Sequence, residues 1–344
     1  MTDLTFAIHD DASESGRPIQ VGCFTRDWEA EEDMDAIQEL LDAGELSLEA
    51  SIARGDALLK KHPDNLEIHS FLGNRYWEAE MRDEAGELYA IGYAKALKLI
   101  PKTFKGRISW YDTDNRSFLR VAHGYLLYLM HQRNGRRAMA LANKLMKWCP
   151  DDNLGVRLLV GDIKTISGDF DGALKTYLKE ADHFPVSWYP AALITFRLGD
   201  YVRACTYLRK GIAGNPYVAE ALTGRTLLAD HLYWHRSNHH NCEFALDYLQ
   251  SAGNDWTDDE CDFVDWVFNS AAILRERAAL MEIHEGLTIE HNFMRRGPWV
   301  ERSLAFASTI DDQLSQALIQ KICNRWGNEV WPWDRDGHNH PRRR

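Results

Sequence analysis

The stretch GDFDGALKTYLKEADHFPVSWYPAALITFRLGDYVRACTYLRKGIAGNP, residues 168–216, contains two periods of one pattern. Each period starts at a Gly-Asp-aromatic turn, at Gly168 and at Gly199, and ends at a proline, at Pro185 and at Pro216. Apolar residues recur at helical spacing before each turn and before each proline. Glycine readily adopts the left-handed backbone that closes a helix, and proline stops the helix that follows. Each period therefore predicts a helical hairpin.

The same pattern recurs upstream at a nearly constant period. Gly135 lies 33 residues before Gly168, and Pro150 lies 35 residues before Pro185. Internal repetition with a period of 20 to 50 residues is typical of solenoid proteins. The sequence therefore predicts a stack of helical hairpins.

The repeats resemble the tetratricopeptide repeat (TPR), which places Trp, Leu-Gly and Tyr on its first helix and Ala, an aromatic residue and Pro on its second. The matching residues are Leu72, Gly73, Tyr76, Ala85 and Tyr89, then Gly161, Gly168, Ala173, Tyr177 and Pro185, then Trp188, Gly199, Ala204, Leu208 and Pro216. Two phrases, CPDDNLGVRLL (149–159) and NPYVAEALTG (215–224), are loosely similar to bacterial suppressor-of-tumorigenicity-7-like proteins. The resemblance implies an all-α, right-handed superhelical solenoid of antiparallel helical hairpins. It also implies a protein–protein interaction scaffold or adaptor.

The periodicity predicts four regions of the chain. Residues 1–26 are expected to be a disordered or extended arm, and 27–216 about five TPR-like hairpins. Residues 217–325 are expected to form irregular helical repeats and a cap, which would cover the apolar side of the last repeat. The Trp, Pro and Arg tail at 326–344 is expected to be mostly disordered. Residues 102–116 interrupt the array.

The composition is that of a globular protein, with 45% hydrophobic and 27% charged residues. The net charge of −12 opposes wholesale binding to nucleic acid. Residues 27–49 contain ten acidic residues and no Lys or Arg, whereas residues 95–157 contain thirteen basic and four acidic residues. The acidic run is expected to be the solvated face of a first helix. Alternatively, it could dock on the basic region as a mimic of an acidic ligand.

The sequence shows no signs of a secreted, membrane-spanning or catalytic protein. There is no signal-peptide pattern and no apolar run of roughly 20 residues, so a cytoplasmic protein is expected. The six cysteines include no CxxC pair, which argues against a disulfide framework and a zinc ribbon. No GxSxG, GxxxxGK or GxGxxG motif is present. We therefore expect no enzyme and no cofactor.

A histidine-rich stretch gives the main alternative, a metal-binding protein or an enzyme that uses the cluster from His231 to Cys242. His231, His235 and His239 recur every four residues, close to Cys242, so imidazoles on one helix face could hold zinc or nickel. On a continuous helix His231 and His239 would lie about 12 Å apart along the axis, too far to share one ion. Polar surface histidines are the favoured interpretation, with His231 and His235 as weak metal candidates. Nucleic-acid binding through the basic region is the second alternative.

The resemblance also implies where a partner binds. TPR ligands usually contact the first helix of each hairpin on the concave side. The corresponding residues here are Asn74, Trp77, Tyr125, Leu129, Arg133, Leu158, Asp162, Tyr189, Leu193 and Arg197. Aromatic and apolar positions mixed with arginines suit an acidic or amphipathic segment of another protein. No membrane partner is expected.

Overall fold

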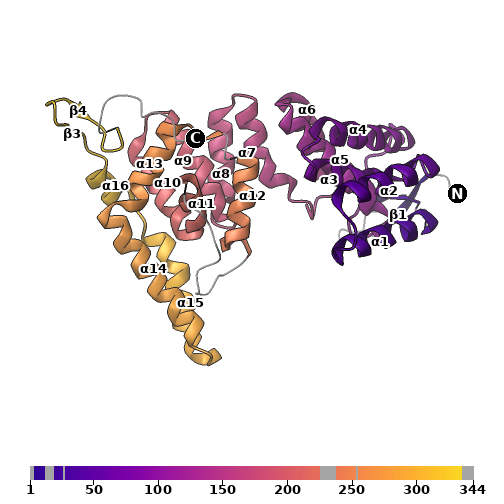
Figure 1. The fold of residues 1–344 in the computed structure, drawn as a ribbon. Helices are drawn as coiled ribbons and strands as arrows, with labels where there is room; N and C mark the ends of the chain where they lie inside the picture. The colour runs from indigo at the N-terminus through magenta and orange to yellow at the C-terminus, as the bar shows by residue number, and fades with distance from the viewer. Residues whose placement is uncertain (1–3, 12–18, 26–27, 225–237, 253–254, 335–344) are drawn as a thin grey trace. The chain divides into compact units, whose positions relative to one another are not determined.

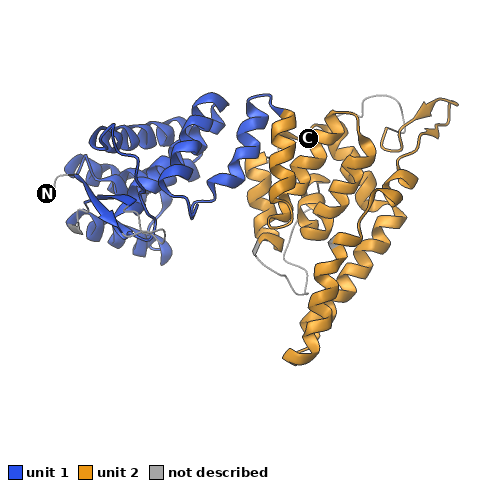
Figure 2. Ribbon diagram, turned by 180° about the vertical axis from the view of Figure 1, so that it is seen from behind, with its two compact units in different colours: residues 1–169 blue, residues 170–344 orange. Residues whose placement is uncertain are grey.

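The computed structural model describes residues 4–11, 19–25, 28–224, 238–252 and 255–334. The chain divides into two compact units, residues 1–169 and 170–344 (Figure 1, Figure 2). The boundary falls next to Gly168, the turn glycine between two predicted helices. Each unit has hydrophobic clusters of its own.

Unit 1 consists of a β-hairpin followed by helices. Its elements are β1 (Phe6–Asp11), β2 (Ile19–Phe24), α1 (Trp28–Asp42), α2 (Leu48–Lys61), α3 (Leu66–Glu78), α4 (Arg82–Leu99), the 3₁₀ turn η1 (Thr113–Asn115), α5 (Arg116–His131), α6 (Gly135–Trp148) and α7 (Val156–Ile166). Neighbouring helices pack in sequence order, α1 on α2, α3 on α4 and α5 on α6. These contacts are those of consecutive helical hairpins.

Unit 2 continues with helices and ends in two short strands. Its elements are α8 (Phe170–Glu180), η2 (Pro185–Ser187), α9 (Trp188–Arg197), α10 (Tyr201–Gly214), α11 (Pro216–Leu222), η3 (Asn238–His240), α12 (Cys242–Ala252), α13 (Asp258–Asn269), α14 (Ala271–Ile289), α15 (Phe293–Phe306), η5 (Ala307–Thr309), α16 (Asp312–Leu318), β3 (Ile322–Cys323) and β4 (Glu329–Val330). The predicted all-α fold of helical hairpins is confirmed in both units. The right-handed superhelix over the whole array stays a prediction.

The turns that separate the helices behave largely as the sequence predicts. Gly168 and Gly199 both adopt left-handed backbone, with φ of 79° and 82°. The third turn differs, because its left-handed residue is Arg133, with φ of 51°, and not Gly135. Gly135 is required for another reason, since a Cβ atom there would overlap the Ser167 hydroxyl. A glycine at a turn can therefore be required because two helices approach closely there, and not only because the backbone φ is positive.

The N-terminal segment forms a β-hairpin. Strands β1 and β2 pair antiparallel from Phe6 opposite Phe24 to Asp11 opposite Ile19. The hairpin docks on residues 102–116, the segment that interrupts the repeats, where the Gly22 amide donates to the Arg107 carbonyl at 2.8 Å. The interruption is thus the docking site of the N-terminal strands.

Asn115 holds the β-hairpin against residues 102–116 by hydrogen bonds. Its side chain is fully buried; Oδ1 accepts from the Phe24 amide at 3.1 Å, and Nδ2 donates to the Gly22 carbonyl at 3.0 Å. The Phe24 ring lies 4.7 Å from that of Phe118 on α5. The strands therefore belong to the core of unit 1.

Near its C-terminus, unit 2 folds back on itself. The rings of Trp331 and Trp333 stack 5.3 Å apart, and Trp333 lies 4.9 Å from Phe263 on α13 and 6.1 Å from Phe196 on α9. The part of the predicted tail at 326–334 is therefore folded, whereas residues 335–344 lie outside the described residues. No helix in the described part of the chain is long and apolar enough to cross a membrane.

Candidate functional site

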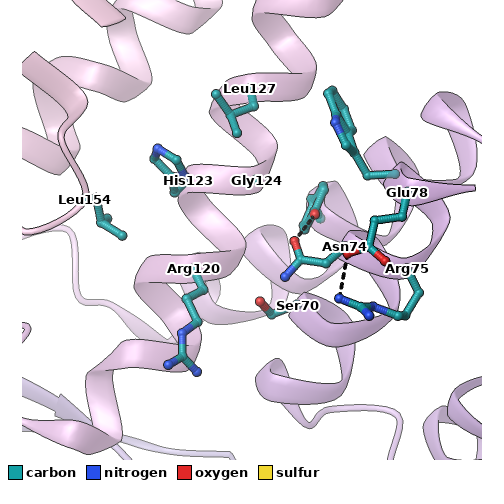
Figure 3. A pocket seen from close by; sticks show the side chains of 11 residues that line it. Ser70, Asn74, Arg75, Glu78, Arg120, His123, Gly124, Leu127 and Leu154 are labelled. Atoms are coloured by element: carbon teal, nitrogen blue, oxygen red, sulfur yellow. Dashed lines mark hydrogen bonds and ion pairs between the residues drawn. The ribbon is translucent and has the colours of Figure 1, made fainter. Parts of the chain in front are cut away.

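A cavity of about 270 Å³ lies in unit 1 between α3, α4, α5 and the loop before α7 (Figure 3). It is lined by Ser70, Asn74, Arg75, Trp77, Glu78, Tyr89, Arg120, His123, Gly124, Leu127 and Leu154. Most of these residues belong to α3 and α5, the first helices of two successive hairpins. The cavity therefore includes Asn74 and Trp77, two of the residues to which the TPR resemblance assigns partner binding.

Tyr89 of α4 forms the inner end of the cavity. A Cβ atom at Gly73 of α3 or at Gly124 of α5 would overlap its ring. The two glycines therefore allow α3 and α5 to close on the Tyr89 ring, which is 3% exposed. Burial raises the pKa of Tyr89 well above its usual value of 10, so its hydroxyl stays protonated and can donate a hydrogen bond.

The Tyr89 hydroxyl orients Asn74. It donates to Asn74 Oδ1 at 2.6 Å. With Oδ1 engaged, the amide nitrogen of Asn74 points into the cavity, on the side where Ser70 and Arg120 lie (Figure 3). An amide nitrogen carries two N–H donors, which suit the backbone carbonyls of an extended peptide. Asn74 is thus an exposed hydrogen-bonding group in a fixed orientation.

Two guanidinium groups give the cavity its charge. Arg75 pairs with Glu78 at 2.7 Å and lies 5.5 Å from the ring of Phe71. Its Nε atom is buried and has no hydrogen-bond partner among the described residues. Arg120, 43% exposed, pairs with Glu67 at the rim. Both guanidinium groups can bind carboxylates through paired hydrogen bonds.

His123 adds a titratable group to the wall. Burial lowers the pKa of His123 below its usual 6.5, and the nearby carboxylate of Asp152 opposes the shift only in part. The imidazole is therefore neutral near pH 7 and can both donate and accept a hydrogen bond.

The outer part of the cavity is apolar. Trp77, Leu127 and Leu154 are half-buried. The Trp77 indole is held between the guanidinium of Arg82, 4.4 Å from its ring centre, and the ring of His131, 5.8 Å away. A fixed aromatic side chain beside fixed polar groups is the composition of an interface hot spot.

The other unit 1 residues expected to bind a partner do not line this cavity. Leu129 is only 3% exposed and belongs to the core. Tyr125 packs 5.5 Å from Tyr93, and Arg133 is exposed where α5 ends. Leu158 and Asp162 are half-buried on α7.

In unit 2, the corresponding residues are buried or paired within the unit. Tyr189 and Leu193 are 0% and 5% exposed, so their side chains are unavailable to a partner without rearrangement. Arg197 Nε pairs with Glu260 Oε1 of α13 at 2.7 Å, and a second nitrogen donates to Glu260 Oε2 at 3.0 Å. We leave these three out of the proposed binding surface.

Sequence reasoning missed Arg120, His123 and Leu127. They follow one another at intervals of three and four residues on α5, so they share one helix face. Ser70 and Asn74 share a face of α3 in the same way. Matching these two polar stripes on successive first helices would have identified the cavity walls.

The described residues offer little support for a metal site. His231 and His235 lie outside them. Cys23, Asp112 and Asp114 place potential ligand atoms within 4.8 Å of one another. Burial, reinforced by these two carboxylates, raises the pKa of Cys23 to about 12. Groups of partly exposed acidic residues are common without an ion, so this cluster carries no metal prediction.

Comparison with known proteins gives similarities at the level of solved structures. No family model and no curated protein matches the chain. The structure of YrrB, a TPR protein with an unusual peptide-binding site, is similar over 52% of this chain and 82% of its own, with 18% identity and a TM-score of 0.38. The structure of MamA is similar over 58% of this chain and 97% of its own, with 16% identity and a TM-score of 0.41.

Proposed function

We propose that the chain is a protein-interaction scaffold or adaptor, and that unit 1 binds a peptide segment or helix of another protein in the cavity between α3 and α5. One observation carries the proposal: the Tyr89 hydroxyl fixes Asn74 so that its amide donors point into a cavity that also contains Arg120. A fixed donor beside a cation and an apolar wall matches the backbone, the acidic side chain and the apolar side chain of a peptide.

The chemistry of the cavity favours an acidic or amphipathic segment. Arg120 is accessible at the rim, and the ion pair that it forms with Glu67 can exchange for a stronger carboxylate contact. Trp77 and Leu127 would contact an apolar side chain of the same segment. Because small-molecule pockets usually start at roughly 300 Å³, a cavity of about 270 Å³ suits one or two peptide side chains better than a complete organic ligand.

Selection from a random peptide library on the full-length protein would test the proposal. We expect enrichment of peptides with Asp or Glu near a large apolar residue. Arg120→Gln should weaken the selected peptides about 10-fold or more, because hydrogen bonds to charged groups contribute roughly 1.5–3 kcal/mol. The matched control is Arg136→Gln, an exposed arginine outside the cavity, which should bind normally.

Two results would contradict the proposal. The first is a selected set without acidic residues whose affinity is the same for the wild type, Asn74→Ala and Arg120→Gln. The second is a small molecule that stabilises the protein and occupies this cavity while no peptide does. Either result would assign the cavity to another class of ligand.

The acidic helix α1 could compete with such a peptide for the basic region of unit 1. Two of its carboxylates, Glu29 and Asp33, lie 3.8 and 3.4 Å from Lys61 Nζ on α2. Competition between this helix and an acidic ligand stays a prediction. Neutralising its exposed carboxylates to amides should strengthen peptide binding at low salt if the competition exists, and unchanged affinity would end the hypothesis.

A further inference from the structure

The α14–α15 hairpin of unit 2 exposes an unusual amount of apolar surface. Of the sixteen large apolar side chains that are exposed among the described residues, six belong to this hairpin. They are Leu274, Met281, Ile289, Phe293, Met294 and Leu304. Within unit 2, the two helices extend away from the other elements (Figure 1, Figure 2). Exposed apolar clusters of this kind mark surfaces for other molecules.

The three most exposed of these side chains lie at the tip. Ile289 ends α14 and is 67% exposed, whereas Phe293 and Met294 begin α15 and are 86% and 81% exposed. Only three residues connect the helices, and Asn292 Oδ1 accepts from the Met294 amide at 3.0 Å. The apolar side chains are therefore presented together by a short, hydrogen-bonded turn.

The hairpin holds the tip away from the core of unit 2. A Cβ atom at Gly286 would lie 2.8 Å from the indole of Trp299, so the two helices are in close contact there. The guanidinium of Arg302 lies 4.8 Å from the Trp299 ring centre on the same helix. Helix α15 contains no buried residue among those described. Its apolar side chains therefore gain little burial from the rest of the unit.

Basic residues follow the apolar tip directly. Arg295 and Arg296 come immediately after Met294, and Arg295 is exposed. Neither forms an ion pair in the described part of the chain. Long arginine side chains can reach anionic phosphates while neighbouring apolar side chains lie deeper. The order, apolar tip and then two arginines, fits the order of a bilayer surface from acyl chains to headgroups.

We propose that the tip of the α14–α15 hairpin inserts Ile289, Phe293 and Met294 into the surface of an anionic lipid bilayer, with Arg295 and Arg296 at the phosphates. A convex tip with three large apolar side chains offers much less than the roughly 800 Å² per partner of a standard protein interface. A bilayer requires no complementary pocket. The sequence predicts no membrane partner because no segment can span a bilayer, but insertion at the surface needs no spanning segment.

Vesicle sedimentation with the full-length protein tests this proposal. We expect binding to phosphatidylcholine vesicles that contain phosphatidylglycerol, and much weaker binding to phosphatidylcholine alone. The double variant F293S/M294S should bind at least about 10-fold more weakly. The variant R295Q/R296Q should bind several-fold more weakly and lose most of its salt dependence. The control Leu198→Ser, at a side chain of unit 2 that is 56% exposed, should bind like the wild type.

Failure of the wild type to bind anionic vesicles would overturn the proposal, and so would equal binding by F293S/M294S. All four substituted side chains lie at the surface or its edge, so circular dichroism should show an unchanged fold. If F293S/M294S loses helix content, Ile289→Ser provides a second variant at the same tip. Vesicle binding needs no peptide ligand, so this test is independent of the cavity in unit 1.

Discussion

Units 1 and 2 are built from the same kind of helical hairpin but use the first helix of the hairpin differently. In unit 1, Asn74 of α3 directs its amide donors into an open cavity. In unit 2, Arg197 of α9 is held by both oxygens of Glu260 from α13. Next to it, Phe196 packs against Trp333 near the C-terminus. The chain thus supplies within unit 2 the kind of carboxylate contact that, in our proposal, a partner supplies in unit 1.

This difference teaches that position in a repeat does not by itself decide whether a side chain is left accessible to a partner. Both Asn74 and Arg197 occupy positions where TPR ligands usually bind. The segments that follow decide the outcome, because α13 and Trp333 cover α9, whereas no described segment fills the cavity beside α3.

The largest effect is expected for Arg197→Met. Glu260 is 7% exposed, and the substitution leaves its carboxylate buried without the guanidinium. We expect a loss of about 3 kcal/mol in the free energy of unfolding, the low end for a broken buried pair, because Arg197 is itself 34% exposed. Peptide-resolved hydrogen exchange should show faster exchange in α9 and α13 and unchanged exchange in α3 and α5.

A matched double variant separates charge from packing in this pair. Replacing Arg197 by Met and Glu260 by Leu together removes the buried charge as well as its partner. Because Glu260 also accepts a hydrogen bond from the Thr257 amide at 2.7 Å, the double variant loses this helix cap and should recover only part of the lost stability. Equal instability of the single and double variants would show that losing the cap costs as much as leaving the buried charge unpaired.

A smaller loss is expected for Trp333→Ala. The side chain is half-buried and contacts five aromatic rings, on Phe196, Tyr201, Phe263, Trp266 and Trp331. Removing it should cost about 2 kcal/mol, less than the 3–5 kcal/mol typical of a fully buried tryptophan. Urea unfolding followed by circular dichroism measures the loss. An unchanged midpoint would mean that the C-terminal segment does not stabilise unit 2.

In unit 1, Asn74→Ala should affect binding more than folding. Affinity for a selected peptide should fall about 5-fold, since a neutral hydrogen bond contributes roughly 1 kcal/mol. Titration calorimetry with the selected peptide measures this change. Thermal unfolding should shift little, because the Tyr89 hydroxyl lines the cavity and can donate to water there when Asn74 no longer accepts its hydrogen bond. A large loss of stability with unchanged affinity would reverse the roles that we assign to the two units.

The smallest expected effect is that of acidification, which should lower the stability of unit 1 more than that of unit 2. Burial lowers the pKa of His69 and of His123 in unit 1, so the unfolded chain binds more protons and stability falls as the pH drops below about 6.5. In unit 2, burial alone would raise the pKa of Glu260, but hydrogen bonds from Arg197 and the Thr257 amide lower it below 4.5. That contribution is complete above pH 4.5 and is lost only as the pH falls through the lowered value.

Hydrogen exchange corrected for its intrinsic pH dependence measures this difference between about pH 7 and pH 5. Burial also lowers the pKa of His239 in unit 2. Acidification should therefore lower the stability of unit 2 slightly and that of unit 1 more. The variant His123→Gln should lose part of the effect in unit 1. Identical pH profiles for that variant and the wild type would exclude His123 as a source.

The sequence predicts the hairpins well because their signals are local. Turn glycines such as Gly168 and Gly199 end one helix, and the prolines follow the next helix, without reference to the rest of the chain. By contrast, the docking of the β-hairpin depends on Asn115, which lies 93 residues after Gly22. No local pattern reveals such a pairing.

The candidate site was predictable in part for the same reason. Repeat position identified Asn74 and Trp77, because the resemblance assigns them to the concave face. It also selected Tyr189 and Leu193, which are buried, since repeat position carries no information about the segments that cover a face. Arg120 and His123 do have a sequence signal, their common face on α5, but repeat position does not select that face.

The junction at Asn115 also has a consequence for how unit 1 is made. During synthesis, Gly22 leaves the ribosome 93 residues before Asn115, which at about 5–20 residues per second is a delay of roughly 5–20 s. Strands β1 and β2 must wait during that time with unpaired edges. The exposed Asp10 and Asp11 on β1 discourage pairing with other chains. Unit 1 therefore cannot finish folding repeat by repeat from its N-terminus, because its first element is among the last to find its place.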